Sequence, residues 1–169
     1  MNEFLTPYFL DEAAWQPMET EAMSWLGTPY RHLGNFKGRG ADCTLFIASV
    51  LKNIGLLSQL DYNYYPRDWH IHGQEEIVVQ YYLAHEKYLP AGLEFEVTDG
   101  LREDHMRGDF VMMTLPPAKV IHHCGIMFGQ NAMIHSINGA GVQLITFKDW
   151  WQRHARRTVR IVHSEKESQ

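Results

Sequence analysis

The sequence contains little cysteine, no excess of positive charge and no long apolar run. Its two cysteines in 169 residues cannot form the disulfide framework of a small secreted domain, so a reducing compartment is expected. Since 15 Lys and Arg face 20 Asp and Glu, the formal net charge is −5, which argues against the basic footprint of a nucleic-acid-binding protein. No apolar stretch approaches the ~18 residues that a membrane span needs. We therefore expect neither nucleic acid nor a membrane as a partner.

Signals for export and for division into domains are also missing. The first twenty residues include acidic side chains and no Lys or Arg, whereas a secretory signal begins with positive charge. The chain is therefore expected to be cytoplasmic at synthesis. No repeat, low-complexity tract or linker rich in Gly, Ser or Pro divides it. We expect one domain over 1–169, with 1–15 and 164–169 peripheral or flexible.

Hydrophobic patterning predicts a helical N-terminal half and a C-terminal half made of strands. Pro17 suits the first position of a helix, and Gly27 suits its end. The interval 27–42 holds four glycines and a proline and is expected to be a loop. Helices followed by antiparallel hairpins indicate an α+β domain. The expected helices cover 17–26, 43–53 and 74–88, with one or two helical turns at 148–154, and the expected strands cover 109–115, 120–128, 132–137, 142–147 and 157–163.

Cys43 lies where the glycine-rich loop ends and a strongly apolar helix is expected to begin. The thiolate is the reactive form of cysteine, and the N-terminus of a helix stabilises negative charge. The unpaired N–H groups at that end also stabilise an oxyanion. The position therefore suits a nucleophile, although free cysteines are more often small buried hydrophobic residues. Cys124 is expected to be such a core residue.

A thiolate nucleophile needs a base, and the segment 121–135 contains three histidines. Strand alternation places His122 and His123 on opposite faces, with His122 facing inward or under a helix. If 129–131 forms a three-residue turn, His123 and His135 become diagonal neighbours on one face, within about 7–8 Å. A two-residue turn would place His135 on the opposite face. With the odd turn, His123 takes the thiol proton and His135 orients its ring, as in a catalytic triad.

Three sequence blocks resemble the NlpC/P60 family of papain-like cysteine peptidases. The first is WLGTPYRHLG at 25–34 followed by GADC at 40–43, which is similar to the family's Leu-Gly-Thr-Pro-Tyr, glycine-rich loop and Asp-Cys box. The second is RGDFV at 107–111, similar to the family's Pro-Gly-Asp-Leu-Val. The third is HCGIMFG at 123–129 with MIH at 133–135, similar to the family's His-Val-Gly-Ile-Tyr-Leu-Gly and later Ile-His. The blocks occur in the family's order.

The resemblance implies a papain-like α+β fold and an activity. A helical half that carries Cys43 would pack on a small antiparallel sheet that carries the two histidines. Cys43 would be the nucleophile, His123 the base and His135 the third, orienting residue. Members of the family mostly cut amide bonds in peptidoglycan stem peptides, often between D-glutamate and the diamino acid, and use no metal or other cofactor. The expected partner is therefore a peptidoglycan stem peptide.

The resemblance also implies residues that contact the substrate. Tyr30 would lie by the nucleophile with its hydroxyl near the reacting carbonyl, and Asp42 would help bind the substrate's free amine or a loop beside it. Thr44 keeps the hydroxyl of the serine that follows the nucleophile in the family, and it is assigned to the same substrate site. Leu45 replaces a glycine and Arg107 replaces a proline of the family pattern, and Leu45 puts the detailed fit of the substrate in doubt.

The insert 62–72, YNYYPRDWHIH, together with the expected helix that carries Tyr81, Tyr82 and His85, resembles the phage and prophage branch of the family. This resemblance predicts association with phage tail proteins, and a protein that is part of the virion or is delivered to the cell wall. The aromatic side chains Tyr64, Tyr65 and Trp69 either line the substrate groove or pack over the sheet as a cap.

Three other interpretations stay open. The spacing of His70 and His72, with the second pair at 122–123, permits zinc binding, but no HExxH or paired-cysteine motif accompanies them. A thiol amidase, acyltransferase or toxin with a substrate outside the wall would use the same three residues, since fold does not fix substrate. A non-catalytic tail-assembly protein would keep the fold alone, and the presence of nucleophile, base and orienting residue argues against it.

Overall fold

The computed structural model of the chain describes residues 5–62, 65–73 and 76–164. Its helices are η1 (Tyr8–Leu10), α1 (Glu12–Met23), α2 (Cys43–Asn53), α3 (Trp69–His72), α4 (Ile77–His85), η2 (Glu86–Tyr88) and α5 (Trp150–Arg153). Its strands are β1 (Asn35–Phe36), β2 (Gly40–Ala41), β3 (Leu93–Asp99), β4 (Phe110–Met113), β5 (His123–Met127), β6 (Ala132–Ile137), β7 (Gly141–Thr146) and β8 (Ala155–His163).

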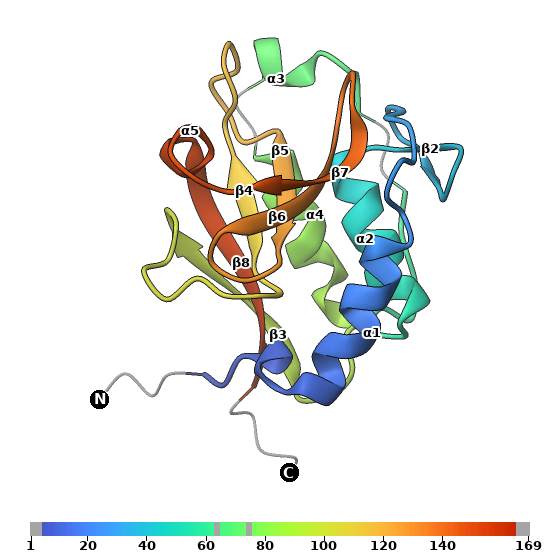
Figure 1. Cartoon of the computed structure of the whole chain (residues 1–169), viewed down its shortest axis with the longest axis vertical. Coiled ribbons are helices and arrows are strands. Elements are labelled where there is room, and N and C mark those ends of the chain that lie inside the picture. Colours follow the sequence, from blue (N-terminus) through green and yellow to red (C-terminus); the bar gives the residue numbers. More distant parts are fainter. Residues whose placement is uncertain (1–4, 63–64, 74–75, 165–169) are drawn as a thin grey trace.

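The main sheet is antiparallel, with the strand order β3-β8-β4-β5-β6-β7. Helix α2 packs against β5 and β6, and α1 packs against α2. Figure 1 shows α1, α2 and α4 gathered on one side of this sheet. The predicted α+β class, with a helical N-terminal half packed on an antiparallel sheet, is therefore confirmed.

Helix α2 begins at Cys43 because Asp42 caps it. Asp42 has an extended backbone, and its Oδ1 accepts a hydrogen bond from Leu45 N at 2.7 Å. This bond satisfies one of the N–H groups that the first turn of a helix leaves unpaired. All residues from 43 to 51 are buried, as the apolar pattern around the whole helix predicts. Packing and the cap together fix the position of the cysteine.

Helix α1 starts earlier than the sequence predicts. Asp11 caps it by accepting a hydrogen bond from Ala13 N at 3.0 Å, and Pro17 lies inside the helix instead of at its first position. The prediction of a helix over 17–26 is wrong at both ends. The physical reason is the burial of Trp15, which holds the earlier turn against the core and overrides the local signal of the proline.

The described part of the N-terminal segment also joins the core. Phe9 is buried and lies edge-on to Trp15, with ring centroids 5.9 Å apart. Trp15 in turn lies edge-on to Phe128, at the end of β5, at 5.1 Å. Phe9 and Trp15 thus pack against the end of β5, and His163 N on β8 donates to Thr6 O at 2.9 Å. Residues 1–4 and 165–169, which belong to the ends expected to be peripheral or flexible, lie outside the described residues.

Five predicted strands correspond to β4–β8, with ends shifted by up to three residues. Strand β3 is an addition, and it pairs with β8 along its whole length. Leu93, Phe95 and Val97 alternate with polar residues along it, as in a strand with one buried face. The small β1–β2 hairpin lies inside the predicted loop 27–42. The predicted helix 74–88 is α4 and η2, with residues 74–75 outside the described residues.

The turn between β5 and β6 contains three residues. Met127 pairs with Met133, and Phe128 N donates to Ala132 O at 2.8 Å, so that 129–131 forms the loop. This register confirms the odd-length turn, and it places residues 123 and 135 on the same face of the sheet because side chains alternate along a strand.

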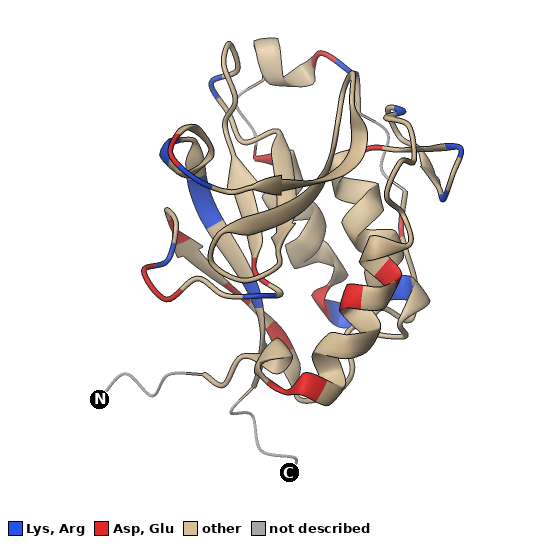
Figure 2. Ribbon diagram, viewed as in Figure 1, with Lys and Arg blue, Asp and Glu red and all other residues tan. Residues whose placement is uncertain are grey.

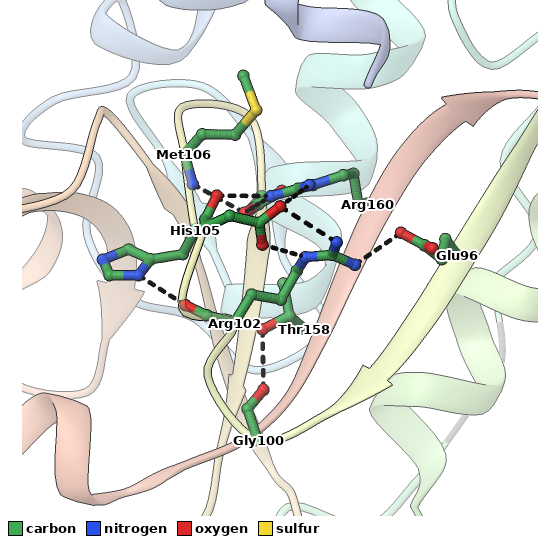
Figure 3. Close-up of polar contacts among 9 residues, drawn as sticks. Glu96, Gly100, Arg102, His105, Met106, Thr158 and Arg160 are labelled. Atoms are coloured by element: carbon green, nitrogen blue, oxygen red, sulfur yellow. Dashed lines mark hydrogen bonds and ion pairs between the residues drawn. The ribbon is translucent and has the colours of Figure 1, made fainter. Parts of the chain in front are cut away.

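Charged residues anchor the segment before β4 to the sheet. Arg160 on β8 donates to the buried carboxylate of Asp109, from Nε to Oδ1 at 2.6 Å and from Nη2 to Oδ2 at 2.8 Å. Asp109 also accepts from Met106 N at 2.9 Å. Arg160 and Arg102 both bind Asp104, and Figure 3 shows the two guanidinium groups side by side. Arg102 first, then Arg160, lowers the pKa of Asp104 to about 2.

Candidate active site

Cys43 is buried beside the start of β5. Its side chain is 6% exposed, and its thiol donates to the carbonyl oxygen of His122 over 3.7 Å. Its Sγ also lies 3.8 Å from Thr44 Oγ1. As the first residue of α2, Cys43 lies at the positive end of the helix dipole, where negative charge is stabilised.

The surroundings of Cys43 favour its thiolate. The Cys124 side chain lowers the pKa of the Cys43 thiol well below its usual value, and His123 lowers it further, against burial, which raises it. Burial, and then Cys43, raises the pKa of Cys124, so this second thiol keeps its proton. Its Sγ lies 3.8 Å from the hydroxyl of Tyr82. Cys124 is a buried residue as expected, but it also interacts with the candidate nucleophile.

His123 and His135 are hydrogen-bonded to each other. His123 Nε2 lies 2.7 Å from His135 Nδ1, and both rings are buried. Because Nε2 of His123 is used in this way, its Nδ1 is the nitrogen left for Cys43. Burial first, and then the charge of His123, lowers the pKa of His135 to about 3, so His135 is neutral near pH 7. The structure thus brings Cys43, His123 and His135 together in an arrangement consistent with a catalytic triad.

Two residues that sequence reasoning missed contact His135. Gln143 lies directly opposite it in the β6–β7 register, and its amide Nε2 is 3.1 Å from His135 Nε2. Trp151 packs edge-on against the imidazole, with ring centroids 5.0 Å apart. The three-residue turn between β6 and β7 is the signal that could have found Gln143, because it fixes which residue lies opposite His135.

Asp42 makes hydrogen bonds with both of its carboxylate oxygens. In addition to the helix cap, its Oδ2 accepts from Leu33 N at 3.0 Å and from the Tyr65 hydroxyl at 3.1 Å. Burial, and then the charge of Cys43, raises the pKa of Asp42 to about 7, although the hydrogen bonds oppose this rise. Asp42 therefore joins the glycine-rich loop, the insert and the nucleophile helix.

Tyr30 and Thr44 lie next to the candidate nucleophile. Tyr30 is half-buried, and burial, followed by the charges of Cys43 and Asp42, raises the pKa of its hydroxyl. The phenol therefore stays protonated and able to donate a hydrogen bond. Thr44 is buried, and its carbonyl oxygen accepts from the Tyr82 hydroxyl at 2.9 Å.

The insert reaches both sides of Cys43. Tyr65 contacts Asp42 as described, and its carbonyl oxygen lies 2.9 Å from His32 Nε2. His70 stacks on His122, with ring centroids 4.5 Å apart and ring planes 12° apart. Trp69 lies edge-on to Tyr65. Tyr64 and the side chain of His72 lie outside the described residues.

The residues that the structure describes contain no group of three or more His, Cys, Asp or Glu side chains that could hold a metal ion. His70 and His122, which the zinc interpretation invoked, stack ring on ring. Among the same described residues, no helix is both long enough and apolar enough to cross a bilayer.

Solved structures with the same fold include three bacterial proteins. A Staphylococcus aureus Mu50 protein described as similar to a lipoprotein of the NLP/P60 family matches with a TM-score of 0.61 and 17% identity, over 97% of this chain and 46% of that protein. A Bacillus cereus NlpC/P60 family protein matches with a TM-score of 0.52 and 18% identity, over 83% of this chain and 38% of that protein. The P60 domain of an antigen from M. avium paratuberculosis matches with a TM-score of 0.50 and 12% identity, over 90% of this chain and 94% of that domain.

This chain thus spans less than half the length of the first two proteins. No curated protein sequence matches it. The sequence model of the NlpC/P60 family matches residues 27–160, which is most of the chain and includes Cys43, His123 and His135. The chain therefore belongs to the NlpC/P60 family of cysteine peptidases.

Proposed function

We propose that the chain hydrolyses amide bonds in peptidoglycan stem peptides, with Cys43 as nucleophile, His123 as base and His135 as orienting residue. The observation that carries this proposal is the chain of contacts from the low-pKa thiol of Cys43 through His123 to a neutral His135. The substrate class comes from the family. Delivery to the wall and association with phage tail proteins stay predictions from the sequence.

The proposed reaction is acyl transfer to sulfur followed by hydrolysis. His123 accepts the thiol proton, and Sγ of Cys43 attacks the carbonyl carbon while the backbone N–H of Cys43 stabilises the oxyanion. As the C–N bond breaks, His123 returns the proton to the leaving amine and a thioester remains on Cys43. His123 then takes a proton from water, which attacks the thioester and releases the acid.

We assign substrate contacts to Tyr30, Asp42 and Thr44. The protonated hydroxyl of Tyr30 suits donation to the reacting carbonyl. Asp42 has less freedom, because a substrate amine would share Oδ2 with Leu33 N and the Tyr65 hydroxyl. We therefore expect Asp42 to act mainly by holding the loop beside the nucleophile.

The test is mass spectrometry of purified peptidoglycan and soluble stem peptides after incubation with the protein. Parallel samples contain the Cys43→Ala variant or a chelator. We expect new stem-peptide fragments that persist with the chelator and fall by at least about 10⁴-fold in rate in Cys43→Ala. If no fragments form but iodoacetamide alkylates Cys43 near neutral pH, the thiol is reactive and its substrate lies outside the cell wall. Absence of fragments with an inert Cys43 would contradict the enzymatic proposal altogether.

A further inference from the structure

A pocket of about 400 Å³ lies between the segment that follows Tyr30 and the β1–β2 hairpin. This volume falls within the ~300–1,000 Å³ that small-molecule sites occupy. Arg31 and Arg39 line it together with the apolar side chains of Leu33 and Phe36. Phe36 is 67% exposed, which is unusual for a large aromatic side chain.

The two arginines give this pocket an unbalanced positive charge. None of its lining residues is acidic, and neither guanidinium makes a hydrogen bond or ion pair with any residue that the structure describes. Lys37, on the same hairpin but outside the pocket lining, pairs with Glu21 at 3.0 Å. Figure 2 shows blue segments along the projecting hairpin, on a chain whose net charge is −5.

The pocket is joined to the candidate nucleophile through one residue. Leu33 N donates to the Asp42 carboxylate at 3.0 Å, and Asp42 N donates to Gly34 O at 3.1 Å. Arg31 N donates to Ala41 O at 3.2 Å. Two hydrogen bonds therefore hold the pocket wall to Asp42, the residue that precedes Cys43.

Gly40 fixes the course of the Arg31 side chain. A Cβ at position 40 would lie 2.6 Å from Arg31 Cβ and 3.0 Å from its Cδ, so the arginine stem lies flat across this glycine. Arg31 thus spends less conformational entropy on holding a ligand than a freely rotating surface arginine does.

We propose that this pocket is a subsite for a carboxylate group of the substrate, carried by a residue next to the amide that is cut. The inference rests on the proposed function, in which the substrate is an acidic stem peptide. An arginine guanidinium binds both oxygens of one carboxylate at once. The apolar side chains of Leu33 and Phe36 can contact the methylene groups that link such a carboxylate to the peptide backbone. The pocket selects stem peptides whose acid is free over those whose acid is amidated.

The test measures binding of two matched stem peptides, one with a free carboxylate and one with a carboxamide in its place, by calorimetry on the Cys43→Ala protein. We expect the carboxylate peptide to bind about tenfold more tightly, and Arg31→Gln and Arg39→Gln each to remove most of this preference. Lys37→Gln is the matched control: it removes the same charge from the same hairpin outside the pocket, and it leaves the preference intact.

Equal binding of the two peptides by a protein whose wild type digests peptidoglycan overturns the subsite and leaves the proposed function standing. If Lys37→Gln loses as much of the preference for the carboxylate peptide as the two arginine variants do, the subsite is also overturned, because the preference then comes from the positive charge of the whole hairpin. A wild type that cuts no peptidoglycan overturns both proposals.

An independent observation concerns the hydrogen atoms along the histidine pair. For His123 Nδ1 to accept the thiol proton, the ring must carry its other proton on Nε2, which then donates to His135 Nδ1. A neutral His135 that accepts at Nδ1 carries its own proton on Nε2, where the amide nitrogen of Gln143 lies 3.1 Å away and cannot accept it. A half-turn of the Gln143 amide exchanges its two terminal atoms and brings the oxygen to this place, where it accepts the bond, whereas the nitrogen would enforce the opposite tautomer.

We infer that Gln143 is a positioning residue that selects the tautomer of His135, and through it the nitrogen at which His123 acts as a base. In serine peptidases, a change of the third triad residue that leaves the catalytic histidine in the wrong tautomer lowers kcat by about 10⁴-fold. The role does not depend on the substrate, because it acts on the reactivity of Cys43.

The test is the pH dependence of Cys43 alkylation by iodoacetamide, combined with ¹⁵N NMR of the histidine rings. We expect Gln143→Leu to move the midpoint of alkylation up by about one pH unit, and Gln143→Glu, which only accepts hydrogen bonds, to restore it. Leu144→Ala, the neighbouring position on the other face of β7, serves as the control and leaves the midpoint unchanged. An unchanged midpoint in Gln143→Leu, or no rescue by Gln143→Glu, overturns the inference.

Discussion

Nδ1 of His135 lies 2.7 Å from Nε2 of His123, and the His135 ring is neutral near pH 7. A carboxylate in this place would stabilise the imidazolium by its charge. A neutral imidazole can do so only through its hydrogen bond and the dipoles behind it. The hydrogen bond that orients His123 therefore depends on the contacts of His135, namely Gln143 on the neighbouring strand and Trp151 at the ring edge.

His135 is expected to make the fold sensitive to acid. Its pKa is about 3 in the folded chain, against about 6.5 for an unfolded histidine. Between these values the unfolded chain binds a proton that the folded chain does not, so the free energy of unfolding falls as the pH drops from about 6.5 to about 3. Urea unfolding at several pH values should show a shallower slope for His135→Gln than for the wild type.

The control for this acid effect is the exposed His163, whose replacement by Gln should leave the slope as it is in the wild type. If His135→Gln and the wild type lose stability equally between pH 6.5 and 4, the buried ring takes up its proton without unfolding, and the prediction is wrong.

A change at Cys43 should be visible at Asp42. The charge of Cys43 is the second cause, after burial, of the raised pKa of about 7 for this carboxyl group. Cys43→Ala removes that charge, so the pKa of Asp42 should fall, as a carboxyl ¹³C titration by NMR would show. Cys43→Ser should lower it as well, because serine keeps the volume and stays neutral. If the pKa of Asp42 stays near 7 in both variants, burial alone raises it and the charge of Cys43 does not contribute.

The parts of the site that follow from a single element were predictable from the sequence. The end of the glycine-rich loop and the apolar pattern place Cys43 at the start of α2, and an odd turn at 129–131 places His123 and His135 on one face. Both follow from local rules, those of loop composition and strand alternation. The family resemblance pointed to the same three residues by an independent route.

The parts that depend on contacts between elements were not predictable. The sequence does not show that Cys124 interacts with the nucleophile, because that contact needs the packing of α2 on β5. The alternation of apolar and polar residues over 93–98 is typical of a strand, but the pairing of β3 with β8 depends on a contact between elements far apart in the sequence. The start of α1 was missed because burial of Trp15 outweighs the local signal of Pro17.

Cys124 is expected to support the reactivity of Cys43. Its side chain is the largest cause of the low pKa of the Cys43 thiol, and its own proton is retained. Cys124→Ala should therefore raise the pKa of Cys43 and slow its alkylation at neutral pH, whereas Cys124→Ser keeps a donor and should slow it less. Equal alkylation profiles for the wild type and Cys124→Ala would mean that His123 and the helix end suffice to ionise Cys43.

Stability of the sheet should depend on the ion pair between Asp109 and Arg160. Both side chains are almost fully buried, and two hydrogen bonds of 2.6 and 2.8 Å join them. Asp109→Ala leaves the guanidinium buried with only the Asp104 contacts to balance its charge, so we expect a loss of about 3–5 kcal/mol in the free energy of unfolding. Arg160→Met alone should destabilise the protein for the converse reason, because it leaves a buried carboxylate.

The double variant Asp109→Ala with Arg160→Met separates the value of the pair from the cost of an unpaired charge. If each single loss comes mainly from the charge left behind, the double variant is more stable than the sum of the two losses predicts, because no buried charge remains. Chemical unfolding of the four proteins gives the interaction energy directly. Strictly additive losses would show that each side chain acts through its other contacts, Met106 N for Asp109 and Asp104 for Arg160, and not through the pair.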